Sequence, residues 1–401
     1  MNGNRQLRVL QVVDTLGMGG AETWLMELLR LWSKTGVVQM DFLLTSGNPG
    51  IFDEEARRLG AGLHYATFRQ SSIAQFARRF RQILRGGCYD VIHDHQDYAS
   101  GWHFLMGFGV LPRLRVTHVH NPWLHMEANY AVGLRRKLAA IAGKDLVKIL
   151  ATHVCGTSRE VLNKYSFEVG QHRGPEVSVV HCGIAIDKFN ANVEYDRQTV
   201  RREFGWAPDV KIVLFVGRLD RAFEFDHPQN HKNSWFALNV ARVALRTEPR
   251  LRLLMAGAGE HERQELERRI AEWGLQGKLN LIGIRRDIPR LMRAADVLLF
   301  PSQQEGLGMA AVEAQSVGLR VLASTAVPRE AIVIPELVHF LPLSEPVTRW
   351  SEMLLDIMSP PRDPAEIYRS AMEVSDFSIA NSARKLLRVY GGTGASEGRV
   401  A

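Results

Sequence analysis

Residues 296–313 read Asp-Val-Leu-Leu-Phe-Pro-Ser-Gln-Gln-Glu-Gly-Leu-Gly-Met-Ala-Ala-Val-Glu. The apolar run at the start predicts a buried strand over 296–300. The Pro-Ser turn and the two glycines predict a loop that leads into a helix near Met309. A short strand that is mostly apolar and is followed by a helix is typical of a parallel sheet covered on both faces. The segment therefore predicts that Glu305 lies at the carboxyl edge of such a sheet.

The same alternation of strands and helices occurs in two blocks, separated by the polar stretch 190–207. Strands are predicted at Leu7–Val13, 40–44, 63–66, Val91–Asp94, 116–119, 150–154 and 177–180, and then at Lys211–Val216, Leu251–Ala256, 279–282 and 296–300. Repeated βα units in two blocks predict an α/β fold with two doubly wound parallel sheets. Because ligands bind outside the carboxyl ends of the strands in such sheets, we expect the site in a cleft between two facing domains.

Length and composition restrict the class of protein. A chain of 401 residues suits two domains of ordinary size. The cysteines Cys88, Cys155 and Cys182 form no CxxC pair, which excludes a disulfide framework and a zinc ribbon and fits a reducing compartment. The N-terminus lacks a signal-peptide cleavage site, and no window reaches about 18 uncharged apolar residues. These features predict a soluble, cytoplasmic protein.

Positive charge is concentrated in the first half of the chain. Residues 1–190 hold 22 Lys and Arg against 16 Asp and Glu, whereas residues 191–401 hold 28 against 27. Such an excess fits either an anionic partner (nucleic acid, a lipid headgroup or a phosphorylated acceptor) or a solvated arginine-rich surface. An apolar stripe over 73–84, flanked by arginines, could lie on an anionic membrane, although packing on its own sheet is the default. No stacking-aromatic or zinc-finger pattern indicates a nucleic-acid partner.

A glycine loop, Gly17-Met18-Gly19-Gly20, joins the first strand to a helix. Free amides and the positive end of a helix favour an anion there. The loop resembles the dinucleotide motif GxGxxG, but Glu22 stands at the third glycine position and repels a pyrophosphate. Anion or acceptor contact is therefore favoured modestly over a plain tight turn.

Two carboxylates eight residues apart, Glu305 and Glu313, can flank an elongated ligand. Between them the amides of Gly308, Met309 and Ala310 form a helix N-terminus suited to hydroxyl or phosphate oxygens. Taken alone, the pair is better explained as one capping glutamate and one solvated helical glutamate.

Two cations complement these carboxylates. Arg218 follows the strand Lys211–Val216, and Lys232 precedes the next helix, so both are expected at the carboxyl edge of the sheet. A guanidinium fork and an ammonium group together suit a diphosphate, although surface cations are the usual state of these residues. The stretch 223–231 lies between them and is predicted to be a surface loop insertion.

Four histidines, His93, His95, His118 and His120, occur in two pairs with a spacing of two residues, so each pair points to one side of its strand. This spacing raises the possibility of a metal site, but a metal needs three or four converging ligands, and no metal is expected. A hydrogen bond from His120 to a substrate hydroxyl is favoured instead.

The ordered set of motifs resembles the family 4 glycosyltransferases of the GT-B type. The motifs are Gly17-x-Gly19-Gly20-Ala21-Glu22, Thr117-His118-Val119-His120-Asn121, Gly156-Thr157-Ser158, Cys182-Gly183-Ile184-x-x-Asp187-x-Phe189, Val216-Gly217-Arg218-Leu219, Ala256-Gly257-x-Gly259 and Pro301-Ser302-x-x-Glu305-Gly306-Leu307-Gly308-x-x-x-x-Glu313-Ala314-x-x-x-Gly318. Residues 313–335 resemble the exopolysaccharide and capsule branch.

The resemblance implies two Rossmann-like domains, 1–190 and 191–374, and a segment 375–401 whose helix returns to the first domain before a frayed tail. It implies transfer of a hexose with retention from a nucleotide-sugar, a UDP-sugar being expected, to a glycan or lipid-linked oligosaccharide of a surface polysaccharide, without a metal. The basic N-terminal half adds one further partner to consider, an anionic membrane contacted peripherally at its inner face.

The resemblance also assigns roles to residues. Glu305 and His120 would contact the transferred sugar as catalytic residues, together with the amides of the helix near Met309. Glu313 would hold the ribose. Arg218, Lys232, Gly19 and Gly20 would contact the diphosphate.

The chain departs from the family in one spacing. Arg218 and Lys232 are fourteen residues apart instead of about five, so the assignment requires the insertion 223–231 to loop out and return Lys232 to the sheet edge. Two alternatives stay open on sequence alone: a glycosyltransferase-like protein that binds nucleotide or glycan without turnover, and an NAD-dependent oxidoreductase.

Overall fold

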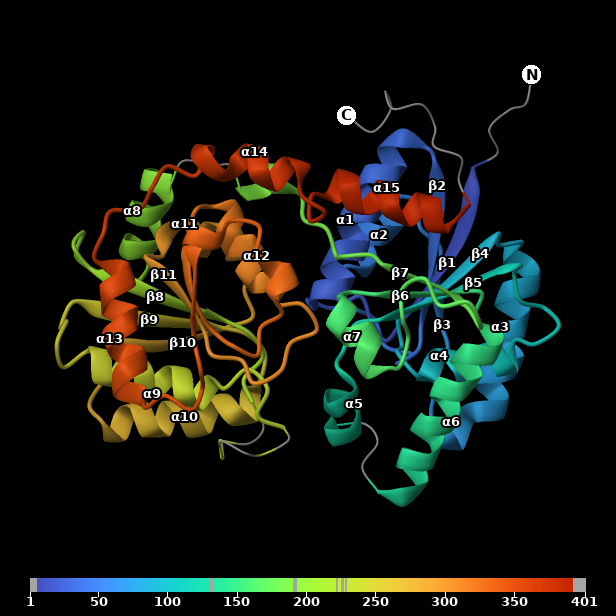
Figure 1. The fold of residues 1–401 in the computed structure, drawn as a ribbon, viewed down its shortest axis with the longest axis horizontal. Helices are drawn as coiled ribbons and strands as arrows, with labels where there is room; N and C mark the ends of the chain where they lie inside the picture. The colour runs from blue at the N-terminus through green and yellow to red at the C-terminus, as the bar shows by residue number, and fades with distance from the viewer. Residues whose placement is uncertain are drawn as a thin grey trace. The chain divides into compact units, whose positions relative to one another are not determined.

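The computed structural model describes residues 6–129, 133–189, 193–220, 223–224, 227 and 229–391 (Figure 1). The chain divides into two compact units. Unit 1 comprises Met1–Ile184 and Asp376–Ala401, and unit 2 comprises Ala185–Ser375. The predicted frayed tail lies, apart from Gly391, outside the described residues. Within the described part, no helix is long and apolar enough to cross a membrane.

Unit 1 is built on a seven-stranded parallel sheet in the order β3-β2-β1-β4-β5-β6-β7. Its strands are β1 Leu7–Val13, β2 Val38–Leu44, β3 Leu63–Tyr65, β4 Val91–Asp94, β5 Leu114–Val119, β6 His153–Gly156 and β7 Glu176–Val179. Its α-helices are α1 Gly20–Thr35, α2 Asp53–Arg58, α3 Ile73–Gly87, α4 Ala99–Met106, α5 Trp123–Asn129, α6 Leu134–Leu150, α7 Arg159–Lys164 and α15 Ile379–Val389.

The last helix, α15, belongs to unit 1 although it follows unit 2 in the chain. Ser378 caps its N-terminus by accepting a hydrogen bond from the amide of Asn381. Its Ser382 hydroxyl accepts a hydrogen bond of 2.9 Å from the indole N–H of Trp24 on α1 and donates one of 2.7 Å to the carbonyl of His181. These buried bonds join both ends of the chain in one core.

Unit 2 is built on a six-stranded parallel sheet in the order β10-β9-β8-β11-β12-β13. Its strands are β8 Lys211–Val216, β9 Leu251–Ala256, β10 Leu279–Gly283, β11 Val297–Phe300, β12 Arg320–Ser324 and β13 Val338–Leu341. Its α-helices are α8 Val193–Glu203, α9 Ser234–Ala244, α10 Glu260–Glu272, α11 Ile288–Ala294, α12 Met309–Ser316, α13 Val347–Met358 and α14 Glu366–Val374.

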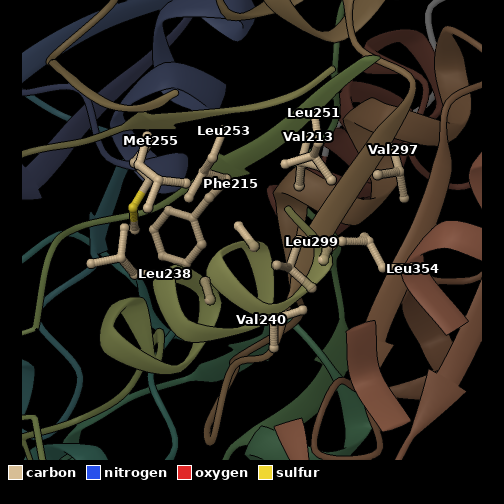
Figure 2. Close-up of a cluster of buried hydrophobic side chains, with 14 of the residues drawn as sticks. Val213, Phe215, Leu238, Val240, Leu251, Leu253, Met255, Val297, Leu299 and Leu354 are labelled. Atoms are coloured by element: carbon tan, nitrogen blue, oxygen red, sulfur yellow. The ribbon is translucent and has the colours of Figure 1, made fainter. Parts of the chain in front are cut away.

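The core of unit 2 lies between its sheet and helices α9, α10 and α13. Figure 2 shows Phe215 of β8 and Leu299 of β11 among the side chains of α9, with Leu354 of α13 beside them. Burying a side chain of this size contributes about 1.5–3 kcal/mol to folding. The apolar central strands predicted from the sequence are therefore the centre of this core.

In each sheet the strand order reverses at one point. In unit 1 it reverses between β1 and β4, and in unit 2 between β8 and β11. The helical crossovers diverge to opposite faces at such a point and leave a crevice at the carboxyl ends of the two strands, where ligands bind in this class of fold. The predicted fold class, two doubly wound parallel sheets, is confirmed.

Several predicted elements differ in detail. The strand predicted at 150–154 begins later, at His153, because the apolar residue Leu150 belongs to the last turn of α6. The polar stretch 190–207 contains α8, and the sequence pattern does not predict β12 and β13. Most of the apolar stripe of α3 (Phe76, Phe80, Ile83 and Leu84) is buried in the core of unit 1, whereas Ile73 at its start is exposed. Packing on its own sheet, the default interpretation, is therefore the correct one.

We predict that Gly257→Ala destabilises unit 2. A Cβ at Gly257 would collide with the carbonyl oxygen of Gly217, where the ends of β8 and β9 meet. Overpacking of this kind costs about 1–3 kcal/mol, which a fall in the thermal unfolding midpoint would reveal. The control is Gly86→Ala on α3, where the added methyl group meets no atom within 4 Å. Equal midpoints for the two variants would contradict the prediction.

Candidate functional site

Two predicted site residues, Arg218 and Glu305, follow the carboxyl ends of β8 and β11 at the reversal point of unit 2. Arg218 follows β8 after Gly217 and is exposed. Glu305 lies in the loop between β11 and α12 and is 8% exposed. Since β8 and β11 are paired strands, the guanidinium and the carboxylate come from neighbouring strand ends.

Asp220 holds the end of the insertion 223–231 at the carboxyl edge of the sheet. Its buried carboxylate accepts hydrogen bonds from the backbone amides of His231, Lys232 and Ser234, at 2.7, 2.8 and 2.8 Å. Its own amide donates to the hydroxyl of Ser234 at 3.2 Å. One side chain therefore ties the end of the insertion and the start of α9 to the end of β8. Part of the insertion (225, 226 and 228) lies outside the described residues.

Lys232 consequently lies at the sheet edge, in spite of the long spacing from Arg218. Its Nζ is 2.6 Å from Oε1 of Glu305 and 5.5 Å from the centre of the Phe300 ring. Its aliphatic stem passes over Gly217, where an added Cβ would be 3.1 Å from Cγ of the lysine. The ammonium group therefore pairs with the predicted catalytic carboxylate and packs beside the residue that precedes Arg218.

Charged side chains of both signs lie at this edge. Burial, together with the charges of Arg218 and Lys232, lowers the pKa of His231 to about 4, so its imidazole is neutral near pH 7. The two cations are accompanied by the carboxylates of Glu305 and of the buried Asp220, and the amides of the insertion already bind the carboxylate of Asp220. Cations beside a nearly buried carboxylate suit an anionic ligand that also carries hydroxyl groups.

The loop from β11 to α12 supplies the remaining predicted residues. Gly308 is the N-cap of α12 with φ of 94°, a left-handed conformation that favours glycine. A Cβ there would be 3.2 Å from both Phe300 and Val327. Met309 and Ala310 open the helix, and Glu313 lies half-buried one turn later. The free amides of this first turn are donors for a ligand oxygen.

In unit 1 the glycine loop follows β1 at the reversal point. Gly19 is the N-cap of α1, and both Gly19 and Gly20 are exposed. The carboxylate of Glu22 lies so close to Gly19 that a Cβ on this glycine would collide with it. Burial, with a smaller contribution from Asp14, raises the pKa of Glu22.

The predicted histidines converge beside this loop. His93 and His95 come from β4 and its end, and His118 and His120 from β5 and its end. The rings of His118 and His120 stack with centroids 4.3 Å apart, and those of His93 and His95 are 4.1 Å apart. Burial is the main cause that lowers the pKa of all four, that of His120 to about 4. The cluster is therefore neutral near pH 7.

A chain of hydrogen bonds fixes the proton positions in this cluster. His120 Nε2 is 2.9 Å from His95 Nδ1, and His95 Nε2 is 2.9 Å from Oε1 of Gln11. The amide nitrogen of Gln11 donates to the hydroxyl of Tyr390, which is 2.7 Å from Nδ1 of His93.

The amide oxygen of Gln11 determines which atom donates in each of these hydrogen bonds. Because an amide oxygen only accepts, His95 donates through Nε2, and a neutral imidazole must then accept at Nδ1. His120 therefore donates through Nε2, and its Nδ1 keeps the lone pair. Gln11 and His95, which the sequence analysis did not single out as site residues, thus set the tautomer of the predicted catalytic histidine. The backbone amide of His120 is held separately, by a 2.8 Å bond to the buried carboxylate of Asp97.

The ring nitrogens of His93, His95 and His118 lie within 4.8 Å of one another, which is a ligand set that a metal could use. Both nitrogens of His95 already take part in hydrogen bonds, so a metal would have to displace Gln11 or His120. The absence of a metal from the reaction stays a prediction.

Comparison with known proteins identifies the family. Residues 18–188 match the family described as Glycosyltransferase Family 4, and residues 210–353 match that described as Glycosyl transferases group 1. The two matches cover both units and all the predicted site residues. The chain is a family 4 glycosyltransferase.

Relatives in the same family support this identification. EpsF of Bacillus subtilis, a glycosyltransferase by name, is 29% identical over 96% of both chains. The capsular polysaccharide biosynthesis glycosyltransferase CapH of Staphylococcus aureus is 23% identical over 79% of this chain and 81% of its own. This transferase thus resembles exopolysaccharide and capsule enzymes, as its sequence predicts.

Solved structures share the fold. The complex of Anabaena HepE with UDP and glucose superposes with a TM-score of 0.76 at 17% identity, over 96% of this chain and all of its own. WaaG, a glycosyltransferase involved in lipopolysaccharide biosynthesis, gives 0.73 at 15% identity over 96% and 100%. These structures confirm the GT-B fold. The family matches confirm the transferase class, and the oxidoreductase alternative is abandoned.

We predict that Asp220→Ala releases the insertion. The substitution leaves the amides of His231, Lys232 and Ser234 without their acceptor, and each buried amide that stays unpaired costs about 1–3 kcal/mol. The variant should unfold at a lower temperature, and limited proteolysis should cut within 223–231. Glu224→Ala, in the same insertion, has an exposed side chain and is the control. If the protease cuts Asp220→Ala within 223–231 no faster than it cuts the wild-type protein, the role assigned to this carboxylate is contradicted.

We also predict that acid destabilises unit 1 through its histidines. Between pH 6.5 and about 4 these histidines are protonated in the unfolded chain but stay neutral when buried in the folded protein. The free energy of unfolding therefore falls as the pH falls. Each such histidine contributes about 1.4 kcal/mol per pH unit. Denaturant unfolding at several pH values should show a shallower slope for His118→Phe, whereas His172→Gln, at an exposed position, should keep the wild-type slope. A flat profile in the wild-type protein would contradict this account.

Proposed function

We propose that this glycosyltransferase takes a hexose from a nucleoside-diphosphate sugar, with a UDP-sugar as donor, and transfers it with retention to a glycan or lipid-linked oligosaccharide during surface polysaccharide synthesis. The observation that carries the proposal is the position of Lys232, 2.6 Å from Glu305 at the edge where Arg218 also lies. The HepE structure, which is a complex with UDP and glucose, supports the choice of nucleotide.

The two cations would bind the diphosphate. In the reaction the bond between the sugar and the diphosphate breaks, and negative charge grows on the departing phosphate oxygen. A fixed guanidinium and an ammonium at that place stabilise the transition state more than the ground state. The amides of Gly308, Met309 and Ala310 would add neutral donors for the sugar or the phosphate.

Glu305 would have two successive partners. Without donor its carboxylate pairs with Lys232. A diphosphate carries more charge than one carboxylate, so we expect it to compete for the lysine and to leave Glu305 to accept hydrogen bonds from the sugar hydroxyls. Glu313 would bind the ribose hydroxyls, since a carboxylate can accept from both.

His120 would accept a hydrogen bond from a hydroxyl of the transferred sugar through Nδ1, the nitrogen that the hydrogen bonds through His95 leave as an acceptor. This nitrogen is 4.0 Å from Sγ of Cys182, so the sugar hydroxyl would replace the thiol as its donor. Gly19 and Gly20 would contact the diphosphate from unit 1. The reaction would need no protein base, because the departing phosphate oxygen can take the proton of the acceptor hydroxyl, and it would proceed without a metal. We place the enzyme in the cytoplasm, at the inner face of the membrane.

The test is thermal stabilisation by UDP, GDP, ADP, CMP and NAD. A ligand at about 100 times its dissociation constant stabilises by about 2.7 kcal/mol, which is a resolvable shift. We expect UDP to give the largest shift and Lys232→Ala to lose most of it. Stabilisation by NAD alone, or none with any nucleotide, would contradict the proposed donor.

Glu305→Gln separates binding from transfer in the same assay. The amide keeps the size of the side chain but no longer holds the ammonium of Lys232 in an ion pair. UDP should therefore stabilise this variant at least as well as the wild type, while transfer from a UDP-sugar falls by a factor of about 100 or more, in the range measured for loss of a transition-state contact. Glu305→Gln protein that UDP no longer stabilises, or that transfers the sugar at the wild-type rate, would contradict the role assigned to Glu305.

A further inference from the structure

A pocket of about 300 Å³ lies on unit 2, between the end of α9 and the segment that leads from α10 into β10. It is lined by Arg242, Leu245, Arg246, Trp273, Leu275 and Lys278. Three of these six side chains are cations, and none is an acid. The pocket thus combines positive charge with an apolar wall made of two leucines and an indole ring.

The three cations of the pocket are not neutralised by the protein. Among the described residues, no acid forms an ion pair with Arg242, Arg246 or Lys278, and their side chains make no hydrogen bond. By contrast, Arg268 on α10 pairs with Glu265 at 2.7 Å. Like charges that line one pocket repel each other, and an anion that enters it relieves this repulsion.

The indole of Trp273 positions one of the cations. Cζ of Arg242 is 4.3 Å from the centre of the Trp273 ring, a distance that gives a cation–π contact. The ring itself packs against that of Trp235, with centroids 5.5 Å apart. The buried Nε of Arg242 has no acceptor among the described residues. A guanidinium stacked on a ring keeps the N–H groups of its edge for an anion.

The charge of the pocket fits a phosphate group better than a carboxylate. The pocket lies beside the C-terminal ends of α9 and α10, and each helix end carries about half a negative charge. These two ends together offset about one of the three positive charges. The remainder of about two matches a phosphate monoester, which carries about 1.5 to 2 negative charges near pH 7. A carboxylate would neutralise only half of it.

The pocket and the proposed donor site lie at opposite edges of the same sheet. Lys278 comes directly before β10, and Arg242 lies in the last turn of α9, so both are where strands begin. Arg218 and Glu305 instead follow the ends of strands. Strands β8 and β9 have six residues each, which span about 20 Å. A ligand in the pocket therefore leaves the donor residues free.

We propose that this pocket is a second anion site, which binds the phosphate group of a sugar phosphate or free phosphate while the donor site is occupied. The guanidinium groups of Arg242 and Arg246 would donate hydrogen bonds to the phosphate oxygens, and the ammonium of Lys278 would add a third charge. Leu245 and Leu275 would contact the carbon skeleton of the ligand. The proposal goes beyond the proposed function and does not depend on the identity of the donor.

The experiment is isothermal titration calorimetry of the full chain with glucose 6-phosphate and with inorganic phosphate, in the presence of saturating UDP. UDP fills the donor site, so the heat reports on the pocket. We expect binding that Arg242→Gln, Arg246→Gln and Lys278→Gln each weaken about tenfold or more, as loss of a charged hydrogen bond does. The matched control Arg268→Gln, an exposed arginine that is already paired, should bind as the wild type does.

The two probes distinguish the source of the phosphate. Tighter binding of glucose 6-phosphate supports a sugar phosphate in contact with the apolar wall, and equal binding supports free phosphate. The proposal is overturned if neither probe binds the wild type, or if the three pocket variants bind as tightly as Arg268→Gln. Circular dichroism checks that each variant is folded, and Arg246→Gln leaves the stacked pair of Arg242 and Trp273 intact.

A titration of Lys232→Ala without UDP keeps this test separate from that of the donor. This variant lacks a cation of the proposed donor site but has an intact pocket. Phosphate binding by Lys232→Ala that Lys232→Ala/Lys278→Gln loses supports the pocket even if UDP binds nowhere, in which case only the proposed donor is refuted. Phosphate binding that Lys232→Ala loses and Lys278→Gln retains would overturn the pocket, because it would assign the phosphate to the donor site.

Discussion

The site in unit 2 depends on one buried carboxylate, that of Asp220. It accepts hydrogen bonds from three backbone amides at the end of the insertion and the start of α9. A connection of a few residues restricts the position of the residue at its end by its length. Here fourteen residues separate Arg218 from Lys232, and the carboxylate supplies the constraint that the longer connection has lost. The ion pair between Lys232 and Glu305 follows from it.

Unit 1 buries several titratable imidazole rings, and these rings must stay neutral in the folded protein. The imidazoles remain neutral since burial lowers their pKa. A neutral histidine has one donor and one acceptor, so Gln11 at one end of the chain of hydrogen bonds can set the tautomer of His120 at the other. Tyr390, directly after α15, bonds to both Gln11 and His93. The return of the last helix to this unit thus completes the polar network as well as the core.

Sequence pattern predicted most of this architecture but not all of the site. Apolar strands such as β1 and β8 are recognisable by themselves, because a central parallel strand is apolar on both faces. The sequence placed Lys232 at the sheet edge only on the condition that the insertion loops out. What meets this condition was not predictable, since it is a set of hydrogen bonds between Asp220 and residues eleven to fourteen positions later. An acidic residue two positions after Arg218, with a serine at the start of α9, was the available signal.

The measurement that tests the central claim most directly is a crystal structure of the enzyme with UDP bound. The account predicts that the diphosphate lies within hydrogen-bond distance of both Arg218 and Lys232, and that Nζ of Lys232 has left Oε1 of Glu305. A structure with UDP bound elsewhere, or with the pair of Lys232 and Glu305 unchanged and no cation on the phosphates, would contradict it.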